Sequence, residues 1–339
     1  MTGAFLSVKD LSVHYPLRKG ASSGAGGVLK AVDGVSFDVA RGASLGIVGE
    51  SGSGKSTTAA AIMRLVDLTA GRIVLGGTEI SSLKGDALRA FRRRMQMIFQ
   101  DPYSSLNPRA RVGDLIREPL DIQEIGSKME REARVSELIE TVGLRPDART
   151  AFPHQFSGGQ RQRIGIARAL ATHPELVVCD EPVSALDVAI QAQILNLLKR
   201  LQRDRGLTYV FISHDLGVVR YMCDQVVVMY RGVVVEQGAT AEVFARPLHP
   251  YTQALIAARP SIHAIGGMER AILPSTRRDV AGAAERASAC RYVGRCPVAD
   301  NRCEAETPAL LEVETGRRAA CFHPFGSFAA TDGGRTRRL

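Results

Sequence analysis

Residues 44–57 read SLGIVGESGSGKST and carry the clearest indication of the fold. A short apolar run is followed by the pattern G-x-x-x-x-G-K-[ST], which extends from Gly49 to Ser56. Glycines allow successive backbone N–H groups to turn toward phosphate oxygens, and a helix beginning there adds a partial positive charge. The stretch therefore predicts a buried strand, a phosphate-binding loop and a helix over about 56–68. A glycine-rich structural turn is the alternative interpretation.

The loop is expected to supply the groups that hold a nucleotide. Lys55 can reach the β- and γ-phosphates, and the Ser56 hydroxyl can bind Mg²⁺. The expected nucleotide-binding residues here are Gly49, Ser51, Gly52, Ser53, Gly54, Lys55, Ser56 and Thr57.

An acidic pair provides the remaining chemistry. Asp180 closes the apolar run LVVCD and is predicted to bind Mg²⁺ as a second ligand, while Glu181 follows directly. A carboxylate beyond a strand end can orient or deprotonate the water that attacks the γ-phosphate. A helix cap is the alternative for this pair. With the phosphate loop, the pair indicates Mg²⁺-dependent hydrolysis of a nucleoside triphosphate.

Other segments extend this fold. Apolar runs at 176–180, 208–213 and 225–230 alternate with helical segments, which is typical of a parallel sheet covered on both faces. Apolar alternation at 5–15 and 29–39 predicts two strands before the phosphate loop, and 112–172 is expected to be mostly helical.

Length and charge set limits on function. The 339 residues suggest about two domains, and no apolar run reaches the ~18–20 residues that would span a bilayer. Lys plus Arg is 44 and Asp plus Glu is 35, a net charge of +9. This balance favours contact with phosphates, nucleic acid or an anionic membrane surface, but basic residues scattered over a solvated surface are the favoured explanation. No nucleic-acid recognition motif accompanies the basic run at 92–94, so nucleic acid is not expected as a partner.

A second glycine motif narrows the class of hydrolase. Residues 156–160 read FSGGQ and are followed by RQRIGIARAL, which resembles the signature of ABC ATPases. Phe156 departs from the Leu that is usual in the family. The serine and glycines would open a helix and present amides to a second phosphate, which in the family belongs to the other subunit. The resemblance implies roles in this contact for Ser157, Gly158, Gly159 and Gln160.

Further family elements occur in the expected order. Gln100 resembles the Q-loop glutamine, Asp187 lies in a D-loop-like SALD, and His214 resembles the switch histidine. The resemblance implies that Gln100 and His214 sense the γ-phosphate beside the catalytic Glu181, and that Gln100 also approaches Mg²⁺. Tyr15 resembles the aromatic residue that stacks on adenine.

The resemblance becomes specific to one group of importers. IFQDPYSSLNPR (98–109), CDEPVSALDVAIQAQILNLL (179–198) and HPYTQAL (249–255) are similar to ATP-binding subunits of dipeptide and oligopeptide importers, of the F type. This implies a second, homologous ATP-binding subunit, two transmembrane permease subunits, an external solute-binding protein, and a peripheral place on the cytoplasmic face of the membrane. An importer of nickel or another solute and a soluble ABC ATPase remain open, as does a non-transport scaffold built on the cysteine-containing region.

The fold class implied is α/β: a P-loop NTPase (ABC ATPase) with a RecA-like parallel sheet. An N-terminal antiparallel β subdomain and a helical signature subdomain at about 101–170 would complete a domain over 1–245. A C-terminal extension at 246–339 would end in a disordered tail.

Four of the six cysteines lie in that extension. Cys290, Cys296, Cys303 and Cys321 have the spacing C-x5-C-x6-C-x17-C, and four thiolates can hold zinc or an iron–sulfur cluster. The spacing lacks the C-x2-C knuckles of a zinc ribbon. The resemblance to the peptide-importer extension implies a [4Fe–4S] cluster, with zinc or no metal as alternatives.

Overall fold

A computed structural model describes residues 3–16, 27–258 and 288–324; the tail expected to be disordered lies outside these residues. The chain divides into two compact units, between Val234 and Val235. This division comes before the boundary expected near residue 246. The reason is that Glu236 bonds to residues further along the chain, accepting hydrogen bonds from the backbone N–H groups of Leu248 and His249, both over 2.9 Å.

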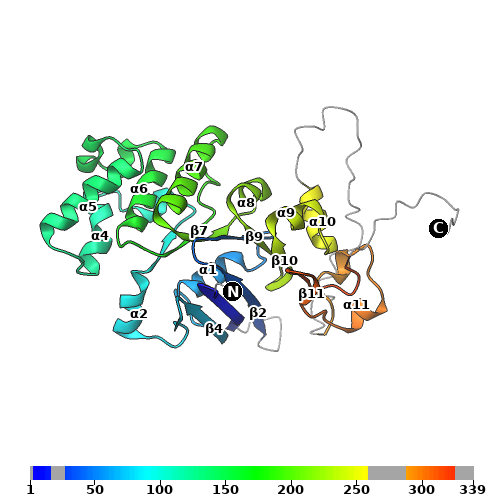
Figure 1. Cartoon of the computed structure of the whole chain (residues 1–339). Helices are drawn as coiled ribbons and strands as arrows, with labels where there is room; N and C mark the ends of the chain where they lie inside the picture. Colours follow the sequence, from blue (N-terminus) through cyan, green and yellow to red (C-terminus); the bar gives the residue numbers. More distant parts are fainter. Residues whose placement is uncertain (1–2, 17–26, 259–287, 325–339) are drawn as a thin grey trace, which may run out of the picture. The chain divides into compact units, whose positions relative to one another are not determined.

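An antiparallel sheet opens the first unit (Figure 1). Its strand order is β2-β1-β4-β5. The strands are β1 (Leu6–Pro16), β2 (Val28–Val39), β4 (Ala70–Leu75) and β5 (Thr78–Glu79). Leu6 and Val8 of β1 are fully buried, as period-2 patterning requires of the face that packs on the core, and a shift of register after Val8 brings Leu11 to a buried position as well. The N-terminal β subdomain is therefore present.

A parallel sheet carries the phosphate loop. In the first unit its order is β9-β3-β8-β7-β6, and neighbouring strands are parallel. The strands are β3 (Ser44–Val48), β6 (Met95–Ile98), β7 (Leu176–Asp180), β8 (Thr208–Ile212) and β9 (Gln225–Tyr230). Each residue of β3 and β8 is buried, because helices and the other sheet cover both faces.

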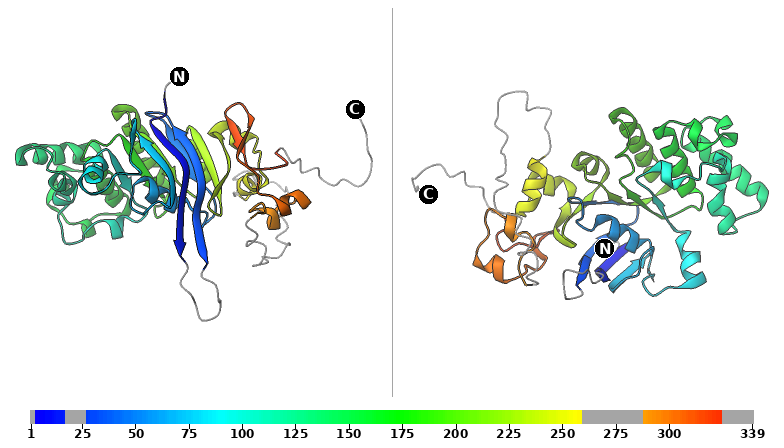
Figure 2. Two further views of the ribbon diagram at one scale, coloured as in Figure 1. Left: turned by 90° about the horizontal axis from the view of Figure 1, so that it is seen from below. Right: turned by 180° about the vertical axis from the view of Figure 1, so that it is seen from behind.

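Three helices pack on this sheet. They are α1 (Lys55–Ile62), α7 (Val188–Arg205) and α8 (Leu216–Met222). Helix α1 lies between the two sheets, as Figures 1 and 2 show. It ends at Ile62 rather than near residue 68, because Arg64 takes a left-handed φ of 54° that no α-helix continues.

The segment between β6 and β7 is helical, as expected. It holds α3 (Pro102–Ser105), α4 (Val112–Ile122), α5 (Lys128–Thr141), η1 (Pro146–Thr150), η2 (Pro153–Gln155) and α6 (Gly158–Leu170). Helix α2 (Gly85–Arg92) precedes β6. Helix α5 begins with a capping box between Ser127 and Glu130, which satisfies two backbone N–H groups of its first turn. Val135, Leu138 and Ile139 form its buried face.

The second unit is built on a short antiparallel arrangement. Strand β12 (Arg317–Ala319) pairs with β10 (Val233–Ala239) and with β11 (Leu311–Glu314). Its helices are α9 (Thr240–Ala245), α10 (Pro250–Ala257), η4 (Val293–Arg295) and α11 (Asn301–Ala305). Arg317 and Glu236 form a buried ion pair of 3.2 Å, and both side chains are almost fully inaccessible.

Candidate active site

The loop between β3 and α1 has the backbone that its glycines permit. Gly54 caps α1 with a φ of 101°, and a Cβ at this position would clash with the carbonyl oxygen of Ala31. Gly49 also has a positive φ, 153°, and a Cβ there would clash with the carbonyl oxygen of Met229. Only glycine therefore fits these two positions.

Lys55 closes over this loop. Its Nζ donates to the carbonyl oxygens of Gly49 and Glu50, over 2.9 Å each. Burial lowers the pKa of Lys55, although the charges of Glu181 and Asp180 act in the opposite direction. The Ser53 Oγ is buried and has no hydrogen-bond partner within the described part of the chain. A buried unpartnered hydroxyl costs free energy, and a phosphate oxygen would satisfy it.

Two oxygen ligands meet beside the loop. The Ser56 hydroxyl donates to Asp180 Oδ1 over 3.2 Å, although 124 positions separate the two residues. Burial raises the pKa of Asp180, and the hydrogen bond from Ser56 partly offsets this. A buried carboxylate next to a hydroxyl gains from a hard divalent cation, because the cation balances its charge and binds oxygen ligands. The pair fits Mg²⁺.

Glu181 lies at the centre of a second group of side chains. Its Oε2 accepts a hydrogen bond from Gln100 Nε2 over 3.0 Å, and its Oε1 lies 3.0 Å from His214 Nδ1. These residues follow β7, β6 and β8, and the carboxyl ends of parallel strands share one edge of a sheet. In the sequence, Gln100 lies 81 positions before Glu181 and His214 lies 33 positions after it, and the structure brings the three residues together. Glu181 takes a left-handed φ of 47°, which is unusual for a residue with a Cβ.

The second glycine motif forms a separate helix start. Ser157 Oγ accepts from Gln160 N over 3.4 Å, and Gln160 Oε1 accepts from Ser157 N over 3.0 Å. This capping box fixes the first turn of α6. A Cβ on Gly159 would clash with Ile190, so glycine lets α6 approach α7 closely. Asp187, which caps α7 by accepting from Ile190 N over 3.0 Å, belongs to the same junction. In the described part of the chain, Ser157 bonds to Gln160 and Asp187 bonds to Ile190, and these bonds do not involve Lys55, Ser56 or Glu181.

Tyr15 ends β1 opposite Leu29 of β2. Its side chain is 40% exposed, and Val28 and Leu29 nearby are exposed as well. Tyr15 and Leu29 pair across the two strands and share one face, which a flat base could cover, whereas the neighbouring Val28 points to the other face. Val28 and Leu29 were not among the residues expected from sequence, because an exposed apolar strand end has no pattern of its own.

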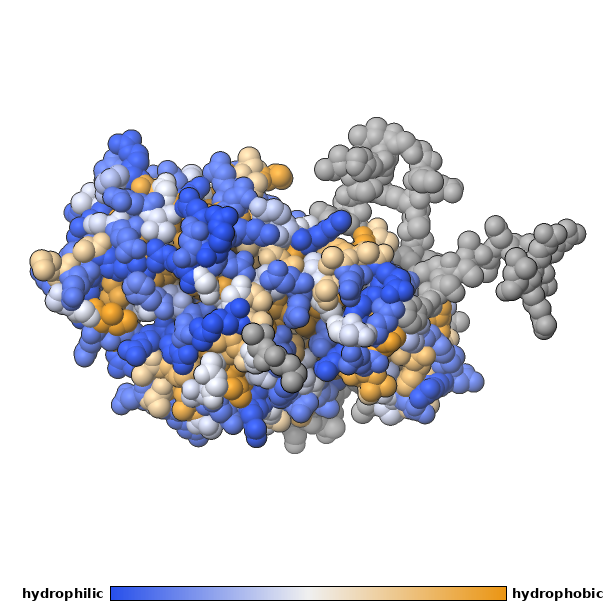
Figure 3. All heavy atoms as spheres, viewed as in Figure 1, coloured by the Kyte–Doolittle hydropathy of each residue, from blue (hydrophilic) through white to orange (hydrophobic). Residues whose placement is uncertain are grey.

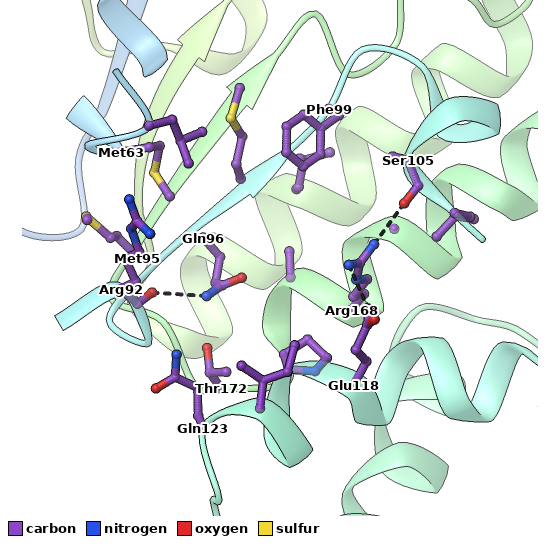
Figure 4. Close-up of a pocket in the computed structure, with 18 of the residues that line it drawn as sticks. Met63, Arg92, Met95, Gln96, Phe99, Ser105, Glu118, Gln123, Arg168 and Thr172 are labelled. Carbon is purple, nitrogen blue, oxygen red and sulfur yellow. Dashed lines mark hydrogen bonds and ion pairs between the residues drawn. The ribbon is translucent and has the colours of Figure 1, made fainter. Parts of the chain in front are cut away.

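A cavity of about 590 Å³ lies between the parallel sheet and the helical segment (Figure 4). Met63, Met95, Phe99 and Ile122 give it apolar walls. Arg168 also lines it, donating to the carbonyl oxygen of Ser105 over 2.8 Å and pairing with Glu118 over 2.8 Å. Arg168 was not expected from the sequence, because it has no spacing relation to the phosphate motifs.

The four cysteines of the second unit are free thiols. Burial raises the pKa of Cys296 and of Cys321 to about 11, with smaller contributions from the charges of other thiols in the set. The backbone joins two of them, because Cys290 N donates to Cys303 O over 2.9 Å. The four thiols therefore influence one another electrostatically. Cys179 and Cys223 are buried free cysteines of the first unit.

Comparison with known proteins identifies two family regions in this chain and relatives that match most of its length. Residues 32–184 match the family described as ABC transporter, and residues 235–303 match the C-terminal region of oligopeptide/dipeptide transporters. A putative peptide import ATP-binding protein of Brucella ovis is 49% identical over 316 residues, covering 93% of this chain and 96% of that protein. The oligopeptide transport ATP-binding protein AppF of Bacillus subtilis is 46% identical over 319 residues, covering 93% of this chain and 96% of the relative.

A solved structure shares the fold of the first unit. A dimeric ATP-binding cassette in a post-hydrolysis state, bound to ADP and Pi, superposes with a TM-score of 0.61 at 30% identity. The match covers 69% of this chain and 98% of that one.

Proposed function

This chain belongs to the ABC transporter ATP-binding family, and we propose that it hydrolyses ATP to drive the import of dipeptides or oligopeptides. One observation carries the proposal. The side chains of Glu181, Gln100 and His214 meet beside a phosphate loop, on a chain whose second unit matches the peptide-transporter C-terminal region. The names of the relatives support the peptide cargo.

Each residue of the site has a task in this proposal. Lys55 leaves its two carbonyl partners to bind the β- and γ-phosphates, and Ser53 satisfies its hydroxyl on a phosphate oxygen. Ser56 and Asp180 hold Mg²⁺, which neutralises charge on the phosphates when bound. The glycine cradle keeps the triphosphate in line with the attacking water.

Glu181 acts as the general base. It takes a proton from the water whose oxygen bonds to the γ-phosphorus, while the bond from that phosphorus to the ADP oxygen breaks. Gln100 and His214 bond the two carboxylate oxygens of Glu181 and hold it in place until a γ-phosphate competes for them. The two residues thereby respond to the presence of the third phosphate.

A second ATP-binding chain completes the site. The start of α6, capped by Ser157 and followed by Gly159, is assigned to a phosphate held by the other chain, because a helix N-terminus favours an anion. The dimeric state of the similar cassette supports this arrangement. ATP would then lie between the loop of one chain and the Ser157 motif of the other, and closure would assemble the catalytic groups.

The cavity beside α4 is proposed to receive a cytoplasmic segment of a permease subunit. Among the described residues, no helix has the length and apolar character needed to cross a bilayer. The face in Figure 3 is mainly hydrophilic, with small hydrophobic patches. A chain of this kind needs a membrane partner to move a solute, and Leu65, Phe99 and Ile122 leave exposed apolar surface along the cavity.

We propose that Cys290, Cys296, Cys303 and Cys321 bind a [4Fe–4S] cluster. Four thiolates can hold either an iron–sulfur cluster or one zinc ion, and the resemblance of this region to the peptide-importer extension favours the cluster. In the described part of the chain, Asp300, Cys303 and His323 have ligand atoms within 4.8 Å of one another, which leaves zinc as the alternative.

Uptake of a radiolabelled dipeptide tests the function. Cells that lack this chain but retain its permeases are complemented with the wild-type chain, with Lys55→Ala, or with Lys84→Ala as a control on an exposed lysine. Uptake restored by the wild type and Lys84→Ala but not by Lys55→Ala supports the proposal. Uptake that does not depend on the chain rejects the peptide cargo, and labelled nickel then tests the main alternative.

Analysis of the metal tests the cluster separately. Protein purified without oxygen should show visible absorption, with iron and sulfide in equal amounts, and Cys303→Ser should lose both. Cys223→Ser, in the first unit, is the matched control. Protein that carries zinc, or no metal under these conditions, contradicts the cluster.

A further inference from the structure

Two arginines of helix α6 hold the short helix α3, which begins just after Gln100. The guanidinium carbon of Arg161 lies 3.9 Å from the centre of the Tyr103 ring. Arg168 Nη1 donates to the carbonyl oxygen of Ser105 over 2.8 Å. Seven positions on a helix are about two turns, so both arginines present one face of α6 to α3.

Both arginines are themselves fixed. Arg161 donates from Nε to the carbonyl oxygen of Pro153 over 2.7 Å and from Nη2 to that of His154 over 3.2 Å. Arg168 is held by Glu118 of α4, as the dashed contacts in Figure 4 show. Each guanidinium is therefore also bonded to an element other than α3, Arg161 to η2 and Arg168 to α4.

Helix α3 affects the active site through Gln100, which lies just before it in the sequence. Asp101 caps α3 by accepting from Tyr103 N over 2.8 Å, and Leu106 directly after α3 is buried. The backbone is therefore fixed on the C-terminal side of Gln100, while β6 fixes it on the other. The Gln100 amide reaches Glu181 from this segment.

We propose that Arg161 and Arg168 are positioning residues that set Gln100 against Glu181, through Tyr103 and Ser105. The inference rests on the proposed ATPase function. Ser157, the group offered to the partner's nucleotide, caps α6, so a movement of α6 on closure carries Gln100 with it. Arg168 also lines the cavity, so a segment bound in the cavity would contact the same arginine that holds α3.

Tyr103→Leu tests the contact in the full-length protein. The Tyr103 side chain is 62% exposed, so the change removes an aromatic face without opening the core. We expect kcat for ATP to fall about two- to fivefold, the scale of one cation–π contact at an exposed site, with KM changed by less than about twofold. Tyr103→Phe keeps the ring and should restore kcat. Tyr221→Leu, an exposed tyrosine under Lys199 elsewhere in the unit, is the matched control.

A double-mutant cycle separates positioning from general loosening. In a Gln100→Ala background, Tyr103→Leu should cause no further fall in kcat, because the side chain it positions is gone. Arg161→Gln should behave like Tyr103→Leu, and combining the two should add little. Wild-type kcat in both single variants overturns the inference, as does an equal fall with and without Gln100. Absence of ATP turnover by the wild-type protein would instead reject the proposed function.

Discussion

Glu181 accepts a hydrogen bond from Gln100 across two neighbouring parallel strands, with 3.0 Å between Oε2 and Nε2. The strands β6 and β7 pair in register up to Ile98 and Cys179, which places the residues that follow them at the same edge. Glu181 is therefore held at this edge of the sheet by residues of its own chain, and its side chain is only 16% exposed. The base of the proposed reaction is positioned by the sheet itself.

Replacing this base should separate binding from hydrolysis. Glu181→Gln keeps the size of the side chain and its contact with Gln100, but the amide cannot take a proton from water. We expect ATP hydrolysis to fall at least about 10²-fold, the scale of general-base catalysis, while ATP binding persists. Steady-state hydrolysis and equilibrium binding of a fluorescent ATP analogue measure the two. Glu140→Gln on the exposed face of α5 should change neither, and hydrolysis at the wild-type rate in Glu181→Gln would reject the assignment.

The glycine cradle predicts a position-specific loss of nucleotide binding. Gly54→Ala places a Cβ against the carbonyl oxygen of Ala31 and forces the loop to move. Gly77→Ala is the matched control, since Gly77 also has a positive φ, 82°, but a Cβ added there would meet no atom within 4 Å. We expect Gly54→Ala to weaken ATP binding at least about tenfold, a cost of about 1.4 kcal/mol, and Gly77→Ala to leave it unchanged. Equal losses in both variants would point to backbone strain in general.

The cavity predicts a selective loss of permease binding. Ile122→Glu adds a charge to an apolar wall, whereas Met129→Glu changes an exposed methionine of α5 that does not line the cavity. Affinity purification of tagged permease subunits should recover Met129→Glu in wild-type amounts and Ile122→Glu at least about tenfold less, because an unpaired charge is costly at a contact. ATP turnover of the isolated chain should be the same in both. Equal recovery would place the permease contact elsewhere.

The second unit carries a buried histidine that predicts acid sensitivity. Burial lowers the pKa of His249 to about 4, below its ordinary value of 6.5. In the unfolded chain His249 therefore binds a proton near pH 6.5, whereas in the folded chain it binds one only near pH 4. His249 thus contributes stability above pH 6.5, and that contribution is lost as pH falls toward 4, by at most about 3 kcal/mol.

His249→Asn removes the titration and keeps the cap, since an amide oxygen can accept from Tyr251 N as His249 Nδ1 does over 3.0 Å. Calorimetry at pH 7 and pH 4.5 should show a smaller acid-induced fall in melting temperature for His249→Asn than for the wild type. The comparison cancels contributions from Glu236, whose pKa is raised by burial. An identical fall in both proteins would exclude His249 as the source.

Sequence reasoning identified the elements that local pattern dictates. The apolar runs before Gly49 and Asp180 are buried strands, and the expected antiparallel subdomain and helical segment are present. The chemistry of the acidic pair predicted Glu181 as a site residue, and the family resemblance predicted Gln100 and His214. The parallel order of β6, β7 and β8 brings the three side chains together.

Other features of the structure depend on tertiary contacts, which no local sequence pattern predicts. The early end of α1 follows from the backbone at Arg64, and the division at Val234 follows from the pairing of Glu236 with residues far along the chain. Arg161 and Tyr103 lie 58 positions apart in the sequence (161 − 103 = 58). Their contact depends on the packing of α3 on α6.

Sedimentation of Glu181→Gln in MgATP tests the central claim, that two chains enclose each nucleotide. The 36.5 kDa chain should sediment as a pair with MgATP, by itself or mixed with a related ATP-binding subunit, and as single chains with MgADP. Adding Ser157→Arg, which blocks the helix start offered to the partner's phosphate, should abolish the pair. Single chains under every condition, with ATP bound at saturation, would contradict the account.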